Sequence, residues 1–427
     1  MQHRISRYAL ILLLTLFAGI LPPPFRSIHI PNPVGKVEAT GGMRIVYLQG
    51  KPYEMGWQQG FLFREELRQF VRQYLYEHLI LEQGIAHFWL LAYARSVDQD
   101  VPDDLREEMQ GIADGAGLSY LDILLLNTIP DLLALARQLP MLESFPLRLS
   151  ATRYNNGKLT LTPCMSFSVW GRATIDGELL LGHHIDSSES NFLSPYLLAV
   201  VRQPAFGNAF VSIGTMGMVG VWAGMNEEKI AVALSSAPSA DIAIHGQPLP
   251  FLLRRALQNA GNVDEAMNTI LAAPRCTGGI ILLGDGKAPD TVALELSAYR
   301  HAIFEVGAER GVLTRTNHFI DPELALLQQD TLSKGEKEMS QARLAQISTQ
   351  LEFNHGWIGI EKALAFLKED SNTISTNTQG LRVSPLYSVL FCPGKFILWV
   401  APERKAPEFY ILLNVSKALL GHDRVRH

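Results

Sequence analysis

The spacing of apolar residues changes near residue 158, and this change limits the possible folds of the chain. Between residues 50 and 140 apolar side chains recur at helical intervals, which predicts helices at 53–80, 82–97, 102–115, 120–126 and 131–138. From residue 158 onward the apolar period is two, which predicts strands at 159–169, 178–182, 196–203, 208–213, 219–224, 229–235, 279–284, 290–297, 301–306, 311–316, 386–392, 396–401 and 408–413. Further helices are expected at 248–260, 263–272, 335–350 and 360–368. Because helices and strands occur in separate blocks, the order predicts an α+β fold rather than a doubly wound parallel sheet.

Composition narrows the class of protein. The chain has 427 residues, of which 47% are hydrophobic and 19% charged, as expected for a globular protein with a large core. The net charge of −5 argues against nucleic acid as a partner, because nucleic-acid binding needs basic patches. The three cysteines cannot build a disulfide framework, and no Cys/His spacing resembles a zinc site. We therefore expect neither a metal nor a cofactor.

The first residues are typical of a targeting segment. Two arginines precede an uncharged apolar run from Tyr8 to Leu21, which three prolines then end. The run is shorter than the ~20 residues of a membrane span and fits the core of a signal peptide. The cleavage pattern is poor, so an uncleaved anchor stays an alternative. We expect residues 1–28 to be a signal peptide or anchor and 29–42 a linker, and the protein to be exported to a bacterial periplasm or held outside the membrane.

Candidate chemistry concentrates around Cys164. The apolar runs that flank Asp176-Gly177 predict a β-hairpin, since Asp-Gly is a favoured two-residue turn. Cys164 then begins one strand, and Asp186 lies just beyond the end of the returning strand. The hairpin would bring the thiol and the carboxylate to the same end of the sheet. A thiol there needs a base, and cleavage after Pro163 would supply one as the α-amino group of Cys164.

Five segments carry a resemblance to a known family. They are Gly50-Lys-Pro-Tyr-Glu-Met-Gly56-Trp-Gln-Gln-Gly60 with Glu108–Ile123; Cys164-x-Ser-Phe-x-x-Trp170-Gly with Asp176-Gly177 and Gly182-His-His-Ile-Asp186; Gly217-Met-Val-Gly220-Val-Trp-Ala-Gly224-Met-Asn-Glu227; Thr316-Asn317-His318-Phe319; and Tyr387-Ser388-Val-Leu-Phe with Leu398-Trp-Val-Ala401-Pro. In this order they resemble the penicillin acyltransferase-like family of N-terminal-nucleophile hydrolases, the acyl-coenzyme A:6-aminopenicillanate acyltransferase type. The resemblance covers roughly residues 43 to 415.

The resemblance implies a fold and a processing event. It implies a four-layer αββα sandwich and a precursor that cuts itself before its nucleophile. Residues 43–163 would form a helical pro-region, and residues 164–427 would form the catalytic fragment. Members of the family act on acyl groups: they hydrolyse the amide bonds of N-acyl compounds or pass the acyl group to an amine.

The resemblance also implies roles for individual residues. Cys164 would be the nucleophile, and its freed α-amine would take the thiol proton and later protonate the leaving amine. Asp186 matches the acid that holds this amine. Asn317 matches the asparagine whose amide N–H stabilises the oxyanion. A proline at position 163 departs from the family pattern, and its fixed φ limits how the carbonyl of the cut bond is presented.

Four further residues are candidates for supporting roles. His183 stands where the family usually has arginine, and it lacks the permanent charge of arginine. Gly217 and Gly220 would present backbone N–H groups or open the acyl pocket, although glycines at a hairpin tip explain them equally well. Ser388 is a candidate hydrogen-bonding residue of the site.

These observations predict a self-processing cysteine amidohydrolase or acyltransferase that forms a thioester at Cys164. Its partner would be a small-molecule acyl amide or acyl donor. Two alternatives stay open. One is a thiol esterase or lipase-like hydrolase acting at the membrane. The other is an unprocessed envelope binding protein on the same fold, which the departures at Pro163 and His183 favour.

Overall fold

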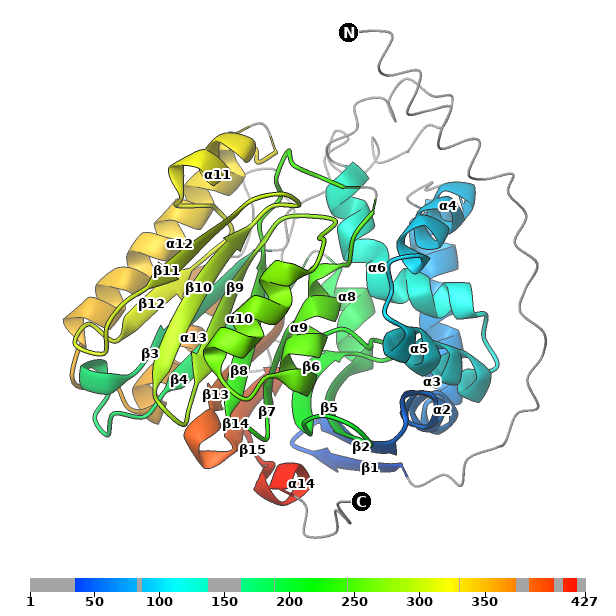
Figure 1. Cartoon of the computed structure of the whole chain (residues 1–427), viewed down its shortest axis with the longest axis horizontal. Helices are drawn as coiled ribbons and strands as arrows, with labels where there is room; N and C mark the ends of the chain where they lie inside the picture. Colours follow the sequence, from blue (N-terminus) through cyan, green and yellow to red (C-terminus); the bar gives the residue numbers. More distant parts are fainter. Residues whose placement is uncertain are drawn as a thin grey trace, which may run out of the picture.

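The computed structural model describes residues 35–82, 87–136, 163–187, 189–243, 245–329, 331–373, 384–402 and 410–420, and two β-sheets form its centre (Figure 1). The first sheet has nine strands, in the order β1 (Lys36–Thr40), β2 (Met43–Gly50), β5 (Leu197–Pro204), β6 (Phe210–Thr215), β7 (Ala223–Asn226), β8 (Ile230–Ser236), β9 (Gly279–Asp285), β10 (Asp290–Leu296) and β11 (His301–Glu305). The second has six, in the order β12 (Val312–Arg315), β3 (Cys164–Val169), β4 (Leu180–Ser187), β13 (Ser384–Cys392), β14 (Ile397–Pro402) and β15 (Ile411–Asn414). Among these pairs, β2 and β5 alone run parallel.

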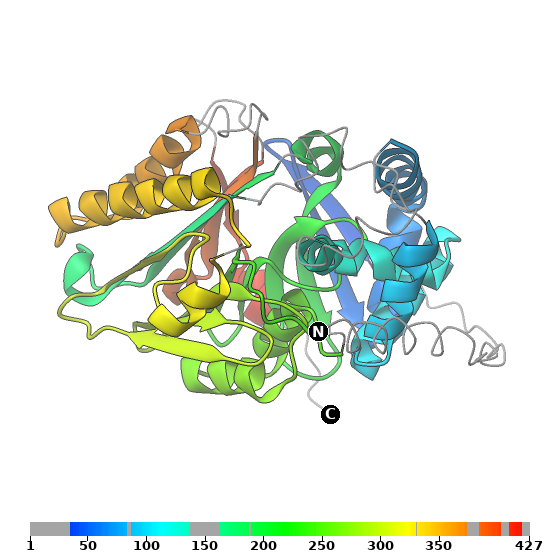
Figure 2. The same cartoon turned by 90° about the horizontal axis from the view of Figure 1, so that it is seen from above.

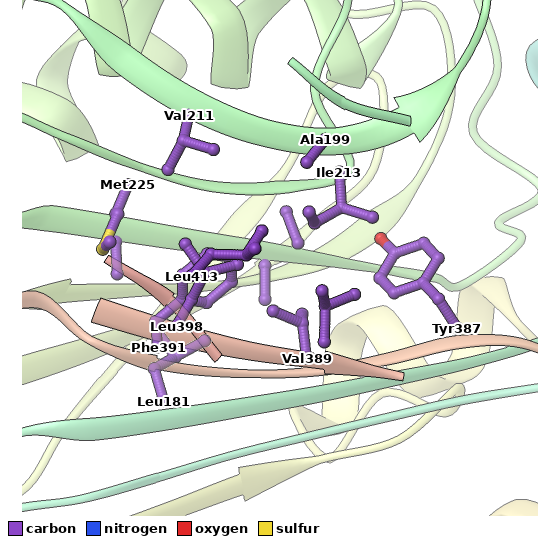
Figure 3. Close-up of a cluster of buried hydrophobic side chains, with 14 of the residues drawn as sticks. Leu181, Ala199, Val211, Ile213, Met225, Tyr387, Val389, Phe391, Leu398 and Leu413 are labelled. Carbon is purple, nitrogen blue, oxygen red and sulfur yellow. The ribbon is translucent and has the colours of Figure 1, made fainter. Parts of the chain in front are cut away.

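Helices cover the outer faces of both sheets. Helices α9 (Leu249–Asn259) and α10 (Val263–Ala272) pack on the nine-stranded sheet, and α12 (Lys334–Phe353) and α13 (Ile360–Thr373) pack on the six-stranded sheet. Figure 2 shows these helix pairs on opposite sides of the molecule. The inner faces of the sheets meet in an apolar core (Figure 3). The predicted α+β class and four-layer αββα arrangement are therefore confirmed.

A second group of helices covers one end of the nine-stranded sheet. It contains α2 (Pro52–Leu62), α3 (Arg64–Phe70), a π-helix (Val71–Glu82), α4 (His87–Asp98), α5 (Asp103–Ala116) and α6 (Tyr120–Ala136). These helices share one buried cluster with strands β2 and β5. The described residues between 43 and 136 are thus mainly helical, but strand β2 is also an integral part of the sheet that the rest of the chain completes. That residues 43–163 form a pro-region stays a prediction.

The structure corrects several expected boundaries. Residues Lys36–Thr40, which we expected to lie in a linker, form strand β1, because they pair along their whole length with β2. The long helix expected at 53–80 is divided into three segments, and the two helices expected at 120–126 and 131–138 are one helix, α6. Short helices at Ser190–Leu193 (α8), Pro322–Leu327 (α11) and Ser416–Leu420 (α14) had no clear apolar period.

The connection between β3 and β4 also differs from the expected tight hairpin. Val169 pairs with Leu180, so a longer loop with a 3-10 turn joins the strands in place of a two-residue turn at Asp176-Gly177. Strand β4 continues to Ser187, which places Asp186 inside the strand rather than beyond its end. The strands are nevertheless antiparallel neighbours, as predicted.

No helix in the described parts of the chain has the length and apolar character needed to cross a membrane. The segment 1–28, where we expected a signal peptide or anchor, lies outside the described residues.

Candidate active site

The peptide bond between Pro163 and Cys164 is held on both sides. Cys164 is the first residue of β3, and its exposed fraction is 2%. Its backbone N–H donates to Oδ1 of Asn317 over 2.7 Å. The carbonyl oxygen of Pro163 accepts from the backbone N–H of Asp186 over 2.8 Å. The nitrogen and the oxygen of the bond that would be cut are therefore both fixed by buried hydrogen bonds.

Asn317 is itself fixed firmly. It follows β12, which pairs with β3 and so brings this distant segment beside Cys164. Its side-chain Nδ2 donates to the carbonyl of Ser236 over 2.8 Å, and its backbone N–H donates to Oγ of Ser340 over 2.9 Å. In this intact chain the Asn317 side chain holds the nitrogen of Cys164, a contact that we expected from Asp186. Its expected oxyanion role in a cleaved form stays a prediction.

The side chain of Asp186 lies in a buried hydrogen-bonded chain. Its Oδ1 is 2.8 Å from Nε2 of His184, and Nδ1 of His184 is 2.6 Å from Oγ of Ser388. Its Oδ2 lies 3.7 Å from Nη2 of Arg343, on helix α12. The structure thus brings Asp186 and Ser388 together through His184. It adds His184 and Arg343, which the sequence analysis missed.

The environment of the thiol disfavours its ionisation in the intact chain. Burial raises the pKa of the Cys164 thiol to about 11, and the nearby Asp186 carboxylate adds to the rise. The Ser236 backbone amide, Arg343 and Asn317 act in the opposite direction but do not outweigh burial. Little thiolate therefore exists at neutral pH before a base is supplied.

His183 lies on the face of β4 opposite to His184, since successive side chains of a strand alternate. Its Nδ1 is 2.8 Å from Oγ of Ser166, which is 3.1 Å from Oγ of Ser235. Burial lowers the pKa of His183 to about 3, and His184 and Arg343 contribute to the fall. His183 is therefore neutral and does not supply the positive charge that arginine would provide at this position.

The loop from Gly217 to Gly220, called the glycine loop below, is anchored by the N-terminal helices. Gly217 donates its N–H to Oε1 of Gln59 over 2.7 Å and accepts from Nδ2 of Asn127 over 2.8 Å. Oδ1 of Asn127 accepts from the N–H of Val219 at 2.8 Å and lies 3.4 Å from the N–H of Gly220. These N–H groups are occupied by side chains of α2 and α6, so the loop is held rather than open. The role of Gly217 and Gly220 toward a substrate stays a prediction.

Two cavities flank helix α12. One, of about 200 Å³, is lined by His318, Phe319, Ile320, Ala325, Gln328, Lys337 and Gln341. The other, of about 270 Å³, lies between the end of β11, strand β12 and helix α12. Neither is lined by Cys164, so both lie apart from the thiol. In the described residues no group of three or more histidine, cysteine or acidic side chains is arranged to hold a metal ion.

The sequence is similar to those of curated proteins. An uncharacterized protein of Archaeoglobus fulgidus is 30% identical over 288 residues, which cover 64% of this chain and 47% of that protein. The Dictyostelium discoideum protein dcd1B is 24% identical over 295 residues, which cover 62% and 53%. The chain therefore spans about half the length of these curated relatives.

The similarity to solved structures is weaker in sequence identity. Conjugated bile acid hydrolase of Clostridium perfringens is 14% identical, with a TM-score of 0.45 over 60% of this chain and 93% of that chain. Penicillin V acylase of Agrobacterium tumefaciens is 16% identical, with a TM-score of 0.43 over 60% and 87%.

The family match covers part of the site. Residues 173–406 match the family described as acyl-coenzyme A:6-aminopenicillanic acid acyl-transferase. The matched span includes Asp186, Asn317 and Ser388 and begins after Cys164. Because it contains more than half of the 427 residues, this chain belongs to the acyl-coenzyme A:6-aminopenicillanic acid acyl-transferase family.

Proposed function

We propose that the chain cuts itself between Pro163 and Cys164 and then acts as a cysteine amidohydrolase or acyltransferase on N-acyl compounds. The observation that carries the proposal is the double restraint on this peptide bond. Asn317 accepts from its nitrogen over 2.7 Å, and the backbone N–H of Asp186 donates to its oxygen over 2.8 Å. A donor at the carbonyl oxygen stabilises the negative charge that develops when a nucleophile attacks the carbon.

The cleavage step follows from this geometry. The sulfur of Cys164 attacks the carbonyl carbon of Pro163, the C–S bond forms, and the oxyanion is held by the N–H of Asp186. The C–N bond then breaks, and the thiol proton goes to the departing nitrogen, which Asn317 holds. Water hydrolyses the resulting thioester, which leaves a carboxylate on Pro163 and a free α-amino group on Cys164.

The free α-amine changes the chemistry of the thiol. Its ordinary pKa of about 7.7 to 8.0 lets it accept the thiol proton near neutral pH. The thiolate attacks an acyl carbonyl, the C–N bond of the substrate breaks, and the ammonium protonates the leaving amine. Water or a second amine then releases the acyl group from the thioester.

Denaturing mass spectrometry tests the proposal. Wild-type protein should give two fragments, the second of which begins at Cys164, whereas Cys164→Ala should stay intact. Cys276→Ala and Cys392→Ala are matched controls, because both thiols are also buried, and both variants should be cut. An intact wild-type chain under folding conditions would refute the proposal and would favour the alternative of a non-catalytic binding protein.

Substrate assays separate the remaining alternatives. The cleaved protein should hydrolyse acyl amides or transfer their acyl group, and paired amide and ester substrates with the same acyl chain would reveal a thiol esterase instead.

We further propose that residues 1–28 direct export to a bacterial periplasm or anchor the protein outside the membrane. Mass spectrometry of the first fragment from a membrane fraction would test this, since its starting residue reports removal of the segment.

A further inference from the structure

A buried tyrosine hydroxyl without a partner among the described residues belongs to the sheet face that carries Cys164. Tyr387 of β13 is fully buried, and its hydroxyl oxygen has no hydrogen-bond partner among the described residues. Figure 3 shows its ring extending from β13 into the space between the two sheets. A buried donor left unpaired destabilises a fold, so such a group calls for an explanation.

The strand register places Tyr387 on the same face as Cys164. Both residues have Ile185 of β4 as their Cα partner, Cys164 from one side and Tyr387 from the other. Directly paired residues point to the same face of a sheet, so both side chains enter the inter-sheet core. The two groups also interact electrostatically: burial, and after it the Cys164 thiolate, raises the pKa of the Tyr387 phenol far above its ordinary value.

Among the described residues, no acceptor is hydrogen-bonded to the Tyr387 hydroxyl. The Tyr387 ring packs against the His183 ring, whose centroid is 6.0 Å away at an interplanar angle of 64°. Nε2 of His183 is also buried without a hydrogen-bond partner in the described part of the chain. Two unpaired polar groups therefore belong to the same face of the sheet as the thiol.

We propose that the hydroxyl of Tyr387 donates a hydrogen bond to the carbonyl oxygen of the acyl group while that group is attacked by, and then bonded to, Cys164. This inference rests on the proposed function and adds a catalytic residue to it. The proton stays on Tyr387 throughout. When the C–S bond forms, the carbonyl π electrons move to oxygen and the donor stabilises that charge; when the C–N bond breaks, the C=O bond forms again.

The proposal assigns a different hydrogen-bond donor to each of the two reactions of the Cys164 thiol. During self-cleavage the carbonyl oxygen of Pro163 already has its donor, the N–H of Asp186. During turnover a substrate carbonyl lies beside Cys164 with Tyr387 as donor. Loss of the Tyr387 hydroxyl should therefore affect turnover and leave self-cleavage unchanged.

The test is Tyr387→Phe, assayed for fragment formation, melting temperature and hydrolysis of an acyl-amide substrate. We expect normal fragments, an unchanged or higher melting temperature, because an unpaired hydroxyl is removed, and a kcat lower by about 100-fold with little change in KM. Tyr74→Phe is the control, since Tyr74 is also buried but lies in the N-terminal helical cluster, and its kcat should stay normal.

Each other outcome has a defined meaning. Normal fragments with an unchanged kcat would overturn the role of Tyr387. A Tyr387→Phe protein that failed to fold, or that melted lower than Tyr74→Phe, would also overturn it, because the hydroxyl would then serve stability. An intact wild-type chain would refute the proposed function itself and is recognised before the variant is compared.

Discussion

Replacement of Glu108 should reveal how strongly the stability of the fold depends on contacts between the chain before residue 163 and the chain after it. Oε1 of Glu108, on α5, accepts from Nε of Arg202 on β5 over 2.8 Å, and its Oε2 lies 2.9 Å from Nη2 of Arg254 on α9. All three side chains are at most 1% exposed. The two guanidiniums also donate to the carbonyls of Met218 and Val219 in the glycine loop. Glu108 lies before residue 163, and its partners lie after it.

The expected loss of stability follows from the burial of this ion pair. Glu108→Gln leaves two buried guanidiniums facing a neutral amide, and removal of one partner from a buried ion pair costs about 3–5 kcal/mol of stability. Burial opposes ionisation of Glu108, but Arg254 and Arg202 together hold the pKa of its carboxyl below the usual value. The stabilisation is therefore present above the unfolded carboxyl pKa of about 4.3 and is lost as pH falls through the lower folded-state pKa.

The assay is urea unfolding followed by circular dichroism. It should be carried out in the Cys164→Ala background, so that every molecule is one uncut chain. The control is Glu107→Gln, which changes the exposed neighbour on the same helix. We expect the stability gap between the two variants to be constant from pH 7 to pH 5.5 and to shrink in stronger acid. A gap below about 1 kcal/mol at pH 7 would refute the reasoning from burial.

Two further variants test the packing of α2 against α5 and the hydrogen bond between Asp186 and His184. Gly56→Ala should destabilise the protein by about 1–3 kcal/mol or more, because a Cβ there would lie 1.9 Å from the carbonyl oxygen of Glu108. Gly307→Ala, whose Cβ meets nothing within 4 Å, is its control, and equal melting temperatures would contradict the close packing of α2 and α5. His184→Ala should slow self-cleavage by roughly 10- to 100-fold, because Asp186 loses a buried partner and its backbone shifts from the Pro163 carbonyl. Timed gels would measure the rate against His301→Ala, an exposed control, and equal rates would exclude a positioning role.

Part of the candidate site could be predicted from the sequence because it lies on neighbouring strands. Cys164 begins β3 and Asp186 lies near the end of β4, and antiparallel pairing of these consecutive strands alone brings them to one end of the sheet. Asn317 entered the prediction through the resemblance, and pairing of β12 with β3 explains its position. Arg343 could not be predicted, because the pattern of α12 does not reveal that its single arginine is buried against Asp186.

The sequence by itself determined the local structure: where apolar side chains repeat every two residues strands form, and where they repeat at helical intervals helices form. These periods depend only on residues close together along the chain. The tertiary structure alone decided that β2 pairs in parallel with β5, and that Glu108 lies between arginines from two later elements. It also decided that Tyr387 lies on the same sheet face as Cys164. Such contacts join residues far apart in sequence, and they form because the whole core packs in one arrangement. The local spacing of apolar residues does not predict that arrangement.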